Sequence, residues 1–187
     1  MSDVTTSLVP PRWLVLWAAL GVVLAVAGAL PQAPPIAPAF VVASCALAIT
    51  AYRRGGPTRA WADALPLPPL IAVHGIRLII GALFLWQYAR GHLPSQFAVR
   101  GGIGDIAVGA LAVPVALARR RGWVLSFTVV GLADILLVFA TAMYLLLIAR
   151  DPLMLAALSQ APYAVLPLGV VPTVILCHAL VLARRAR

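Results

Sequence analysis

The chain of 187 residues contains no lysine and no glutamate, and charged residues of all kinds make up only 10% of it. Every basic residue is arginine, and every acidic residue is aspartate. Hydrophobic residues make up 63%, and the mean hydropathy is +1.03. A soluble domain of this size would have to expose a mostly apolar surface, so this class is excluded. The sequence therefore predicts a polytopic membrane protein.

Cysteine is also scarce, because Cys45 and Cys177 are the only two and both lie in apolar stretches. This placement excludes an exported disulfide framework and favours reduced, buried thiols. A soft-metal site that joins them is disfavoured, since Cys177 and its neighbour His178 point about 100° apart on a helix. The arginines give a pI of 11.3 but are not gathered into one polar domain, which argues against a nucleic-acid partner.

Apolar runs of about 20 residues, the length that crosses the hydrocarbon core as a helix, recur along the chain. They show no strict alternation of apolar and polar residues, so helices are favoured over a barrel. The first run is longer than the core of a typical signal peptide and is interpreted as a membrane helix. We expect an all-α transmembrane bundle of about six helices in one membrane domain, with an N-terminal helical pair (1–60) and a four-helix core (61–187). The predicted helices are 13–31, 36–53, 68–89, 101–118, 123–148 and 162–183.

The distribution of arginines predicts the orientation, because positive residues collect on the cytoplasmic side of a membrane. Ten arginines fall on one side of the predicted bundle and three on the other. The pattern predicts a multi-pass protein of a bacterial inner membrane with both termini in the cytoplasm. Its partners would be the lipid bilayer and, in addition, further copies of the chain or a larger membrane complex. The ten are Arg12, Arg53, Arg54, Arg59, Arg119, Arg120, Arg121, Arg184, Arg185 and Arg187, and the three are Arg90, Arg100 and Arg150.

Three charged residues, Arg77, Asp105 and Asp134, fall inside predicted membrane helices, where an ionised side chain is costly and usually functional. Arg77 and Asp134 come out near the midplane, so an ion pair between the third and fifth helices is expected. Such a pair would either fix the register of the helices or break on protonation of Asp134 and switch the bundle between two packings. Asp105 is expected about 6 Å inside the external edge, where it would cap the helix or meet Arg100.

Two histidines, His74 and His178, have similar predicted depths on the third and sixth helices. They are candidate axial ligands of a b-type haem, for which Arg77 could contact a propionate. The alternative is that each histidine only forms a hydrogen bond with a neighbouring helix. In the predicted external loop, His92 and Arg100 are candidates for a headgroup site of a lipid-acting enzyme.

The segment Gly102-Ile103-Gly104-Asp105 matches the GxGD signature of intramembrane aspartyl proteases, and Asp134 would be the second carboxylate of a dyad. The order of the two helices departs from the protease pattern, in which GxGD lies on the later helix. The predicted depths also separate the two carboxylates by about 8 Å. A packing role for Gly101, Gly104 and Gly109 is therefore favoured.

A wider set of motifs resembles a family of small uncharacterised bacterial membrane proteins. The resemblance covers about residues 75–183 and implies that Arg77, Asp105, Asp134 and His178 belong together, without implying an activity. The motifs are Phe97-Ala98-Val99-Arg100-Gly101-Gly102-Ile103-Gly104-Asp105, Gly131-Leu132-Ala133-Asp134, Leu166-Pro167-Leu168, Val171-Pro172 and His178.

The sequence as a whole predicts an integral inner-membrane protein that handles a proton, an ion or a small polar solute through a buried Arg/Asp cluster, by translocation or by sensing. The alternatives are a haem-binding electron-transfer or accessory subunit, a structural partner of a membrane complex, and a lipid-acting enzyme or GxGD-type protease. Whether the protein is an enzyme is left open, and a protein without enzymatic activity is favoured. No catalytic residue and no metal ligand set is assigned from the sequence.

Overall fold

A computed structural model describes residues 9–29, 33–158 and 163–185 of the chain. The described residues form helices and connecting turns, with no strand among them. The predicted all-α class is therefore confirmed.

Among the described residues, five helical segments are long and apolar enough to cross a membrane. Several contain a local change of helix type. A 3-10 turn at Val73–Gly75 joins α5 (Leu67–Ala72) to α6 (Ile76–Ala89), and a π-helical turn at Leu166–Val170 precedes α10 (Val171–Arg185). The other three segments are α3 (Ile36–Arg54), α7 (Ser95–Ala118), and α8 (Arg121–Met143) with its π-helical extension Tyr144–Ile148.

The first predicted membrane helix, 13–31, corresponds to α1 (Arg12–Val26), which has 15 residues. At 1.5 Å per residue it spans about 22 Å, which is shorter than a hydrocarbon core of about 30 Å. Residues 30–32 lie outside the described part of the chain. The described structure therefore supports five full spans and one shorter apolar helix.

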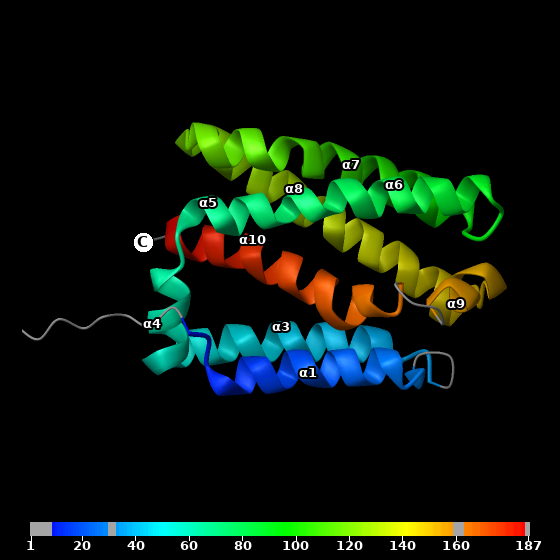
Figure 1. Ribbon diagram of the computed structural model, residues 1–187, viewed down its shortest axis with the longest axis horizontal. Helices are drawn as coiled ribbons and strands as arrows, with labels where there is room; N and C mark the ends of the chain where they lie inside the picture. The colour runs from blue at the N-terminus through cyan, green and yellow to red at the C-terminus, as the bar shows by residue number, and fades with distance from the viewer. Residues whose placement is uncertain (1–8, 30–32, 159–162, 186–187) are drawn as a thin grey trace, which may run out of the picture.

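The helices run roughly along one axis, and α10 lies at the centre of their arrangement (Figure 1). On one side α10 packs against α3, and the π-helical turn before it packs against α1. On the other side α10 packs against α5 and α8, while α7 packs against α5, α6 and α8. Helix α10 thus connects the N-terminal pair to the group of helices that carries Arg77, Asp105 and Asp134.

Arginines stand at the ends of several helices that meet at one end of the bundle, and we call it the arginine-rich end. The ends of α3 and α10 lie there together with the junction of α7 and α8. The short helix α4 (Gly56–Ala64) crosses this end and is fastened to α10, because the Arg184 guanidinium donates hydrogen bonds to the carbonyls of Ala62 and Leu65. The opposite end holds the turn between α6 and α7 and the short helix α9 (Pro152–Leu158).

Helices α4 and α9 lie between the membrane helices predicted from the sequence, and local signals explain why they are helical. Pro57 occupies the first turn of α4. A backbone amide at this position has no hydrogen-bond acceptor within the helix, so proline loses no helical hydrogen bond there. Asp151 precedes α9, and its Oδ1 accepts a hydrogen bond of 2.9 Å from the amide of Met154, as an N-cap does. Both helices are too short to span a membrane.

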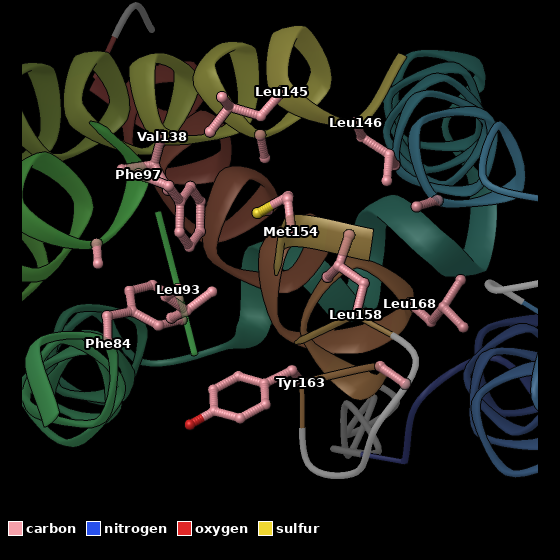
Figure 2. Close-up of a cluster of buried hydrophobic side chains, with 14 of the residues drawn as sticks. Phe84, Leu93, Phe97, Val138, Leu145, Leu146, Met154, Leu158, Tyr163 and Leu168 are labelled. Atoms are coloured by element: carbon pink, nitrogen blue, oxygen red, sulfur yellow. The ribbon is translucent and has the colours of Figure 1, made fainter. Parts of the chain in front are cut away.

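An apolar core fills the half of the bundle near α9 (Figure 2). Met154 of α9 points into this core toward Phe97 of α7 (Figure 2). Large apolar side chains also cover the outside of the bundle, including Leu16, Ile79, Leu117 and Val130. An apolar exterior on helices of this length suits contact with lipid chains and indicates an integral membrane protein.

Helices α6 and α7 pack closely because glycines remove side chains from their interface. A Cβ atom built on Gly109 would collide with the backbone of Leu78, and one on Gly81 would lie 2.9 Å from Asp105 Cβ. This close approach brings the buried face of α6, which carries Arg77, against the face of α7 that carries Asp105.

Candidate functional site: a buried arginine between two aspartates

Arg77 on α6 is 1% exposed and connects three helices through its guanidinium group. Its Nε donates to Oδ1 of Asp105 on α7 at 2.6 Å, and its Nη2 donates to Oδ2 of Asp134 on α8. The third nitrogen, Nη1, donates to the backbone carbonyl of Gly131 at 3.2 Å. We call Arg77, Asp105 and Asp134 the central cluster. The structure thus brings together the three charged residues singled out in the sequence.

Asp105 was expected near the external surface, capping the helix or meeting Arg100, and this expectation is wrong. Helix α7 begins at Ser95 instead of residue 101, so Asp105 lies ten residues, or about 15 Å, inside it. The carboxylate is buried and bound by Arg77, while Arg100 is exposed. Hydropathy placed the helix start too late because Ser95, Gln96 and Arg100 are polar. Pro94 occupies the N-cap position of α7, and no described side chain caps this end of the helix.

The GxGD segment has a structural explanation in which each glycine makes room for a specific neighbour. A Cβ on Gly102 would lie 2.9 Å from Leu85 Cγ on α6, and a Cβ on Gly104 would overlap the Asp134 carboxylate on α8. Asp105 follows and binds Arg77. Because the guanidinium pairs with both carboxylates, the arrangement differs from a dyad in which two carboxyls share a proton. The geometry therefore favours a salt-bridged cluster over a protease site.

The charges of the central cluster do not balance when all three groups are ionised. One guanidinium faces two carboxylates, and no other basic side chain among the described residues forms a salt bridge with either of them. Asp105 is 4% exposed and Asp134 18% exposed at the side chain. An uncompensated carboxylate at the centre of a membrane helix costs about 3 kcal/mol, so a proton or a cation at this site would be stabilised.

His74 and His178 lie beside the central cluster on the side of the arginine-rich end. Their rings stack with centroids 3.8 Å apart and planes 23° apart, and each residue is 1% exposed. His74 precedes Arg77 by three residues, which is one turn. His178 packs against Gly131, where a Cβ atom would lie 2.6 Å from its Cε1. Two ring nitrogens, Nδ1 of His74 and Nε2 of His178, are buried without a hydrogen-bond partner among the described residues.

The two histidines do not fit the expected axial ligation of a haem. Axial imidazoles must approach the iron edge-on from opposite faces of the macrocycle, and these rings lie face to face with no space for a macrocycle between them. Phe127 also packs on both rings, at centroid distances of 5.6 Å from His74 and 5.7 Å from His178. The unpartnered nitrogens are compatible with a ligand, but the stacking is not compatible with this one.

The remaining residues considered in the sequence do not join the cluster. His92 lies exposed in the turn between α6 and α7, with Nδ1 3.4 Å from Oε1 of Gln87. Arg100 lies on α7 instead of in an external loop. Cys45 and Cys177 are free thiols, and the described residues contain no group of three or more side chains that could hold a metal ion. The structure thus places His92 in the turn and Arg100 within α7, and neither contributes to the central cluster.

The sequence did not reveal a cavity of about 70 Å³ that reaches the central cluster from the end opposite the arginines. Arg77 and Asp105 line its inner end, and Leu93, Met154 and Tyr163 line the part near α9. Between them the walls are mostly aliphatic and aromatic. We call this space the cavity. It depends on contacts among α6, α7, α8, α9 and α10, which no local sequence pattern indicates.

The fold and the central cluster define a helical integral membrane protein with an arginine and two aspartates paired inside the bundle. The chain belongs to the family described as a domain of unknown function, DUF8737, whose model matches residues 33–185. The match includes all residues of the central cluster and both buried histidines, and it begins after α1. No curated protein and no solved structure matches the chain. The description of this family names no activity, and the resemblance noted over residues 75–183 stays a prediction.

Proposed function

We propose that this protein handles a proton inside the membrane, by translocation or by sensing, and that the central cluster is the site where the proton resides. The observation that carries the proposal is the pairing of one buried guanidinium with two buried carboxylates. One proton on Asp105 or Asp134 makes the cluster neutral, which is the favoured state in hydrocarbon. Loss of this proton would leave an excess negative charge and weaken the contacts among α6, α7 and α8.

The surroundings of the cluster support a path for the proton. The cavity meets Arg77 and Asp105 from the α9 end, and the stacked histidines lie on the other side of the cluster. The side chain of Asp134 is 18% exposed and that of Asp105 is 4% exposed, and we propose Asp134 as the carboxyl that carries the proton. A small cation is the alternative occupant, because it would balance the same charge.

We further propose that the arginine-rich end faces the cytoplasm of a bacterial inner membrane. The support is the positive-inside rule, applied to the ends of α3 and α10 and to the junction of α7 and α8. Two exposed tryptophans match interfacial positions at opposite ends of the bundle. The guanidinium of Arg120 lies 5.4 Å from the ring of Trp123, and that of Arg90 lies 4.9 Å from the ring of Trp86.

A purely structural role is the competing function, and one observation favours it. The Arg77 guanidinium uses all three nitrogens to connect α6 with α7 and α8, as a device that fixes helix register would. The two functions differ in what a neutral substitution does. If the cluster only fixes register, Asp134→Asn changes stability, whereas a proton site also requires that proton movement is lost.

The test is proton flux in proteoliposomes with a trapped pH dye, under an imposed pH gradient and a potassium–valinomycin potential. We expect flux with the wild-type protein, and a loss of about a hundredfold with Asp134→Asn or Asp105→Asn. The matched control is Asp151→Asn, which removes a carboxylate outside the spans and keeps a residue able to cap α9. Equal flux in wild type, Asp134→Asn and empty liposomes would overturn translocation. A sodium or potassium flux that depends on Asp134 would assign the site to a cation instead.

A further inference from the structure

We infer that His178 is the proton acceptor on the arginine-rich side of the central cluster, and that His74 positions it by stacking. This inference rests on the proposed function and adds the group to which the proton passes. It starts from two features that a packing role leaves unexplained: the buried imidazoles stack on each other, and each has a ring nitrogen with no partner among the described residues.

The position of His178 relative to α8 supports a transfer from Asp134. The ring packs against Gly131, whose absent Cβ would lie 2.7 Å from Nε2, the nitrogen without a partner. Gly131 is one turn before Asp134 on the same helix, and its carbonyl accepts a hydrogen bond from Arg77. A glycine at this position is needed because any side chain would displace the imidazole. The free nitrogen therefore lies beside the helix that carries the proton donor.

The transfer conserves charge inside the membrane. In the step, the O–H bond of the Asp134 carboxyl breaks and an N–H bond forms at Nε2 of His178, which leaves a carboxylate and an imidazolium. Before the step, Arg77 and ionised Asp105 balance each other while Asp134 and His178 are neutral. After it, two cations face two carboxylates, so the unit stays neutral in both states and avoids the cost of a net charge in hydrocarbon.

The groups around His178 are consistent with this role. Helix α6 contributes a cation, helices α7 and α8 contribute the two carboxylates, and the turn before α6 contributes the stacked imidazole. Phe127 packs against both imidazole rings, so the environment of the rings is apolar on that side. The titratable and charged groups concerned are Arg77, Asp105, Asp134 and His74, together with Cys177 on α10 itself.

The first arm of the test is proton flux for His178→Phe and His74→Phe, with His178→Gln in case the larger ring does not fit. Phenylalanine keeps an aromatic ring for stacking but cannot accept a proton, and glutamine keeps hydrogen bonding without titrating. We expect flux to fall about a hundredfold with either substitution at His178 and by less with His74→Phe. The matched control is His92→Phe in the exposed turn, which should leave flux unchanged. Wild-type flux in folded His178→Phe would overturn the inference.

The second arm measures the histidines directly by ¹⁵N NMR of protein labelled only at histidine. The chain has three histidines, so His92 is an internal reference. We expect Asp134→Asn to shift the nitrogen resonances of His178 and to leave those of His92 in place. Absence of a shift at His178 would overturn the inference even if wild-type flux is present. Conversely, absence of wild-type flux would overturn translocation, and a His178 shift that depends on Asp134 would still support the transfer within a sensor.

Discussion

Nε of Arg77 on α6 lies 2.6 Å from Oδ1 of Asp105 on α7, and both side chains are almost fully buried. The same guanidinium binds Asp134 on α8, so two carboxylates depend on one cation. Removal of Arg77, the shared partner, should lower the free energy of unfolding more than removal of either carboxylate does. The reason is that the carboxylates left without a partner stay in the membrane.

This asymmetry predicts an order of stability among variants of the cluster. Arg77→Ala should lower the free energy of unfolding by about 3 to 5 kcal/mol. Asp134→Asn should cost about 1 to 3 kcal/mol, since the remaining Arg77–Asp105 pair is neutral. Arg77→Lys should also lower the free energy of unfolding, although it keeps the positive charge. A single ammonium group lacks the planar fork that reaches both carboxylates. Unfolding in detergent measures the three values. Equal losses for Arg77→Ala and Asp134→Asn would contradict the shared pairing.

Close packing of α6 and α7 predicts a sharp difference between two glycine substitutions. Gly109→Ala should destabilise the protein by about 2 kcal/mol, because the new methyl group meets the Leu78 backbone, which cannot rotate away. Gly122→Ala at the start of α8 is the matched control, since a Cβ there meets nothing within 4 Å. Thermal unfolding compares the two. A Gly109→Ala protein as stable as the control would show that the helices are farther apart than described.

The cavity predicts a substitution that blocks proton access without touching a charged group. Ala142 on α8 lines the cavity, so Ala142→Val adds two methyl groups to a space of about 70 Å³. We expect slower proton flux with unchanged or higher thermal stability, because filling an apolar void restores contacts. The control is Ala140→Val, at an exposed position of the same helix. Unchanged flux in Ala142→Val would remove the cavity from the proton path.

The orientation predicts which positions react with an impermeant thiol reagent on intact cells. In a protein with Cys45 and Cys177 changed to alanine, Ser95→Cys at the start of α7 should react from outside. Gly122→Cys at the arginine-rich end should react only after the cells are opened. Both positions are exposed, so access depends on the side of the membrane. The reverse pattern would invert the proposed topology.

The sequence predicted the fold class and much of the cluster because both depend on position along a helix. Arg77 and Asp134 each fall near the middle of an apolar run, and the structure places their side chains in contact. Asp105 came out too shallow because hydropathy does not detect a polar first turn, which Pro94 and Ser95 begin. The contact between Gly131 and His178 joins residues far apart in the chain.

The stacking of His74 and His178 illustrates a second limit of the sequence. Similar depth on two helices indicates that the residues are neighbours but does not define how their rings face each other. Edge-on rings would suit a haem, and face-to-face rings do not. The cavity is a third case, because its volume depends on how five helices pack and on the position of α9, a helix that the hydropathy pattern did not indicate.

The proposed function requires that one carboxyl of the central cluster holds a proton inside the membrane. Infrared spectroscopy of the protein in lipid, compared between H₂O and D₂O, tests it most directly through the C=O stretch of a protonated carboxylic acid. We predict such a band in the wild-type protein at neutral pH, its shift in D₂O, its loss in Asp105→Asn or Asp134→Asn, and its persistence in Asp151→Asn. Absence of this band from the wild-type protein at neutral pH would mean that both carboxylates are ionised. That result would contradict a proton held in the central cluster.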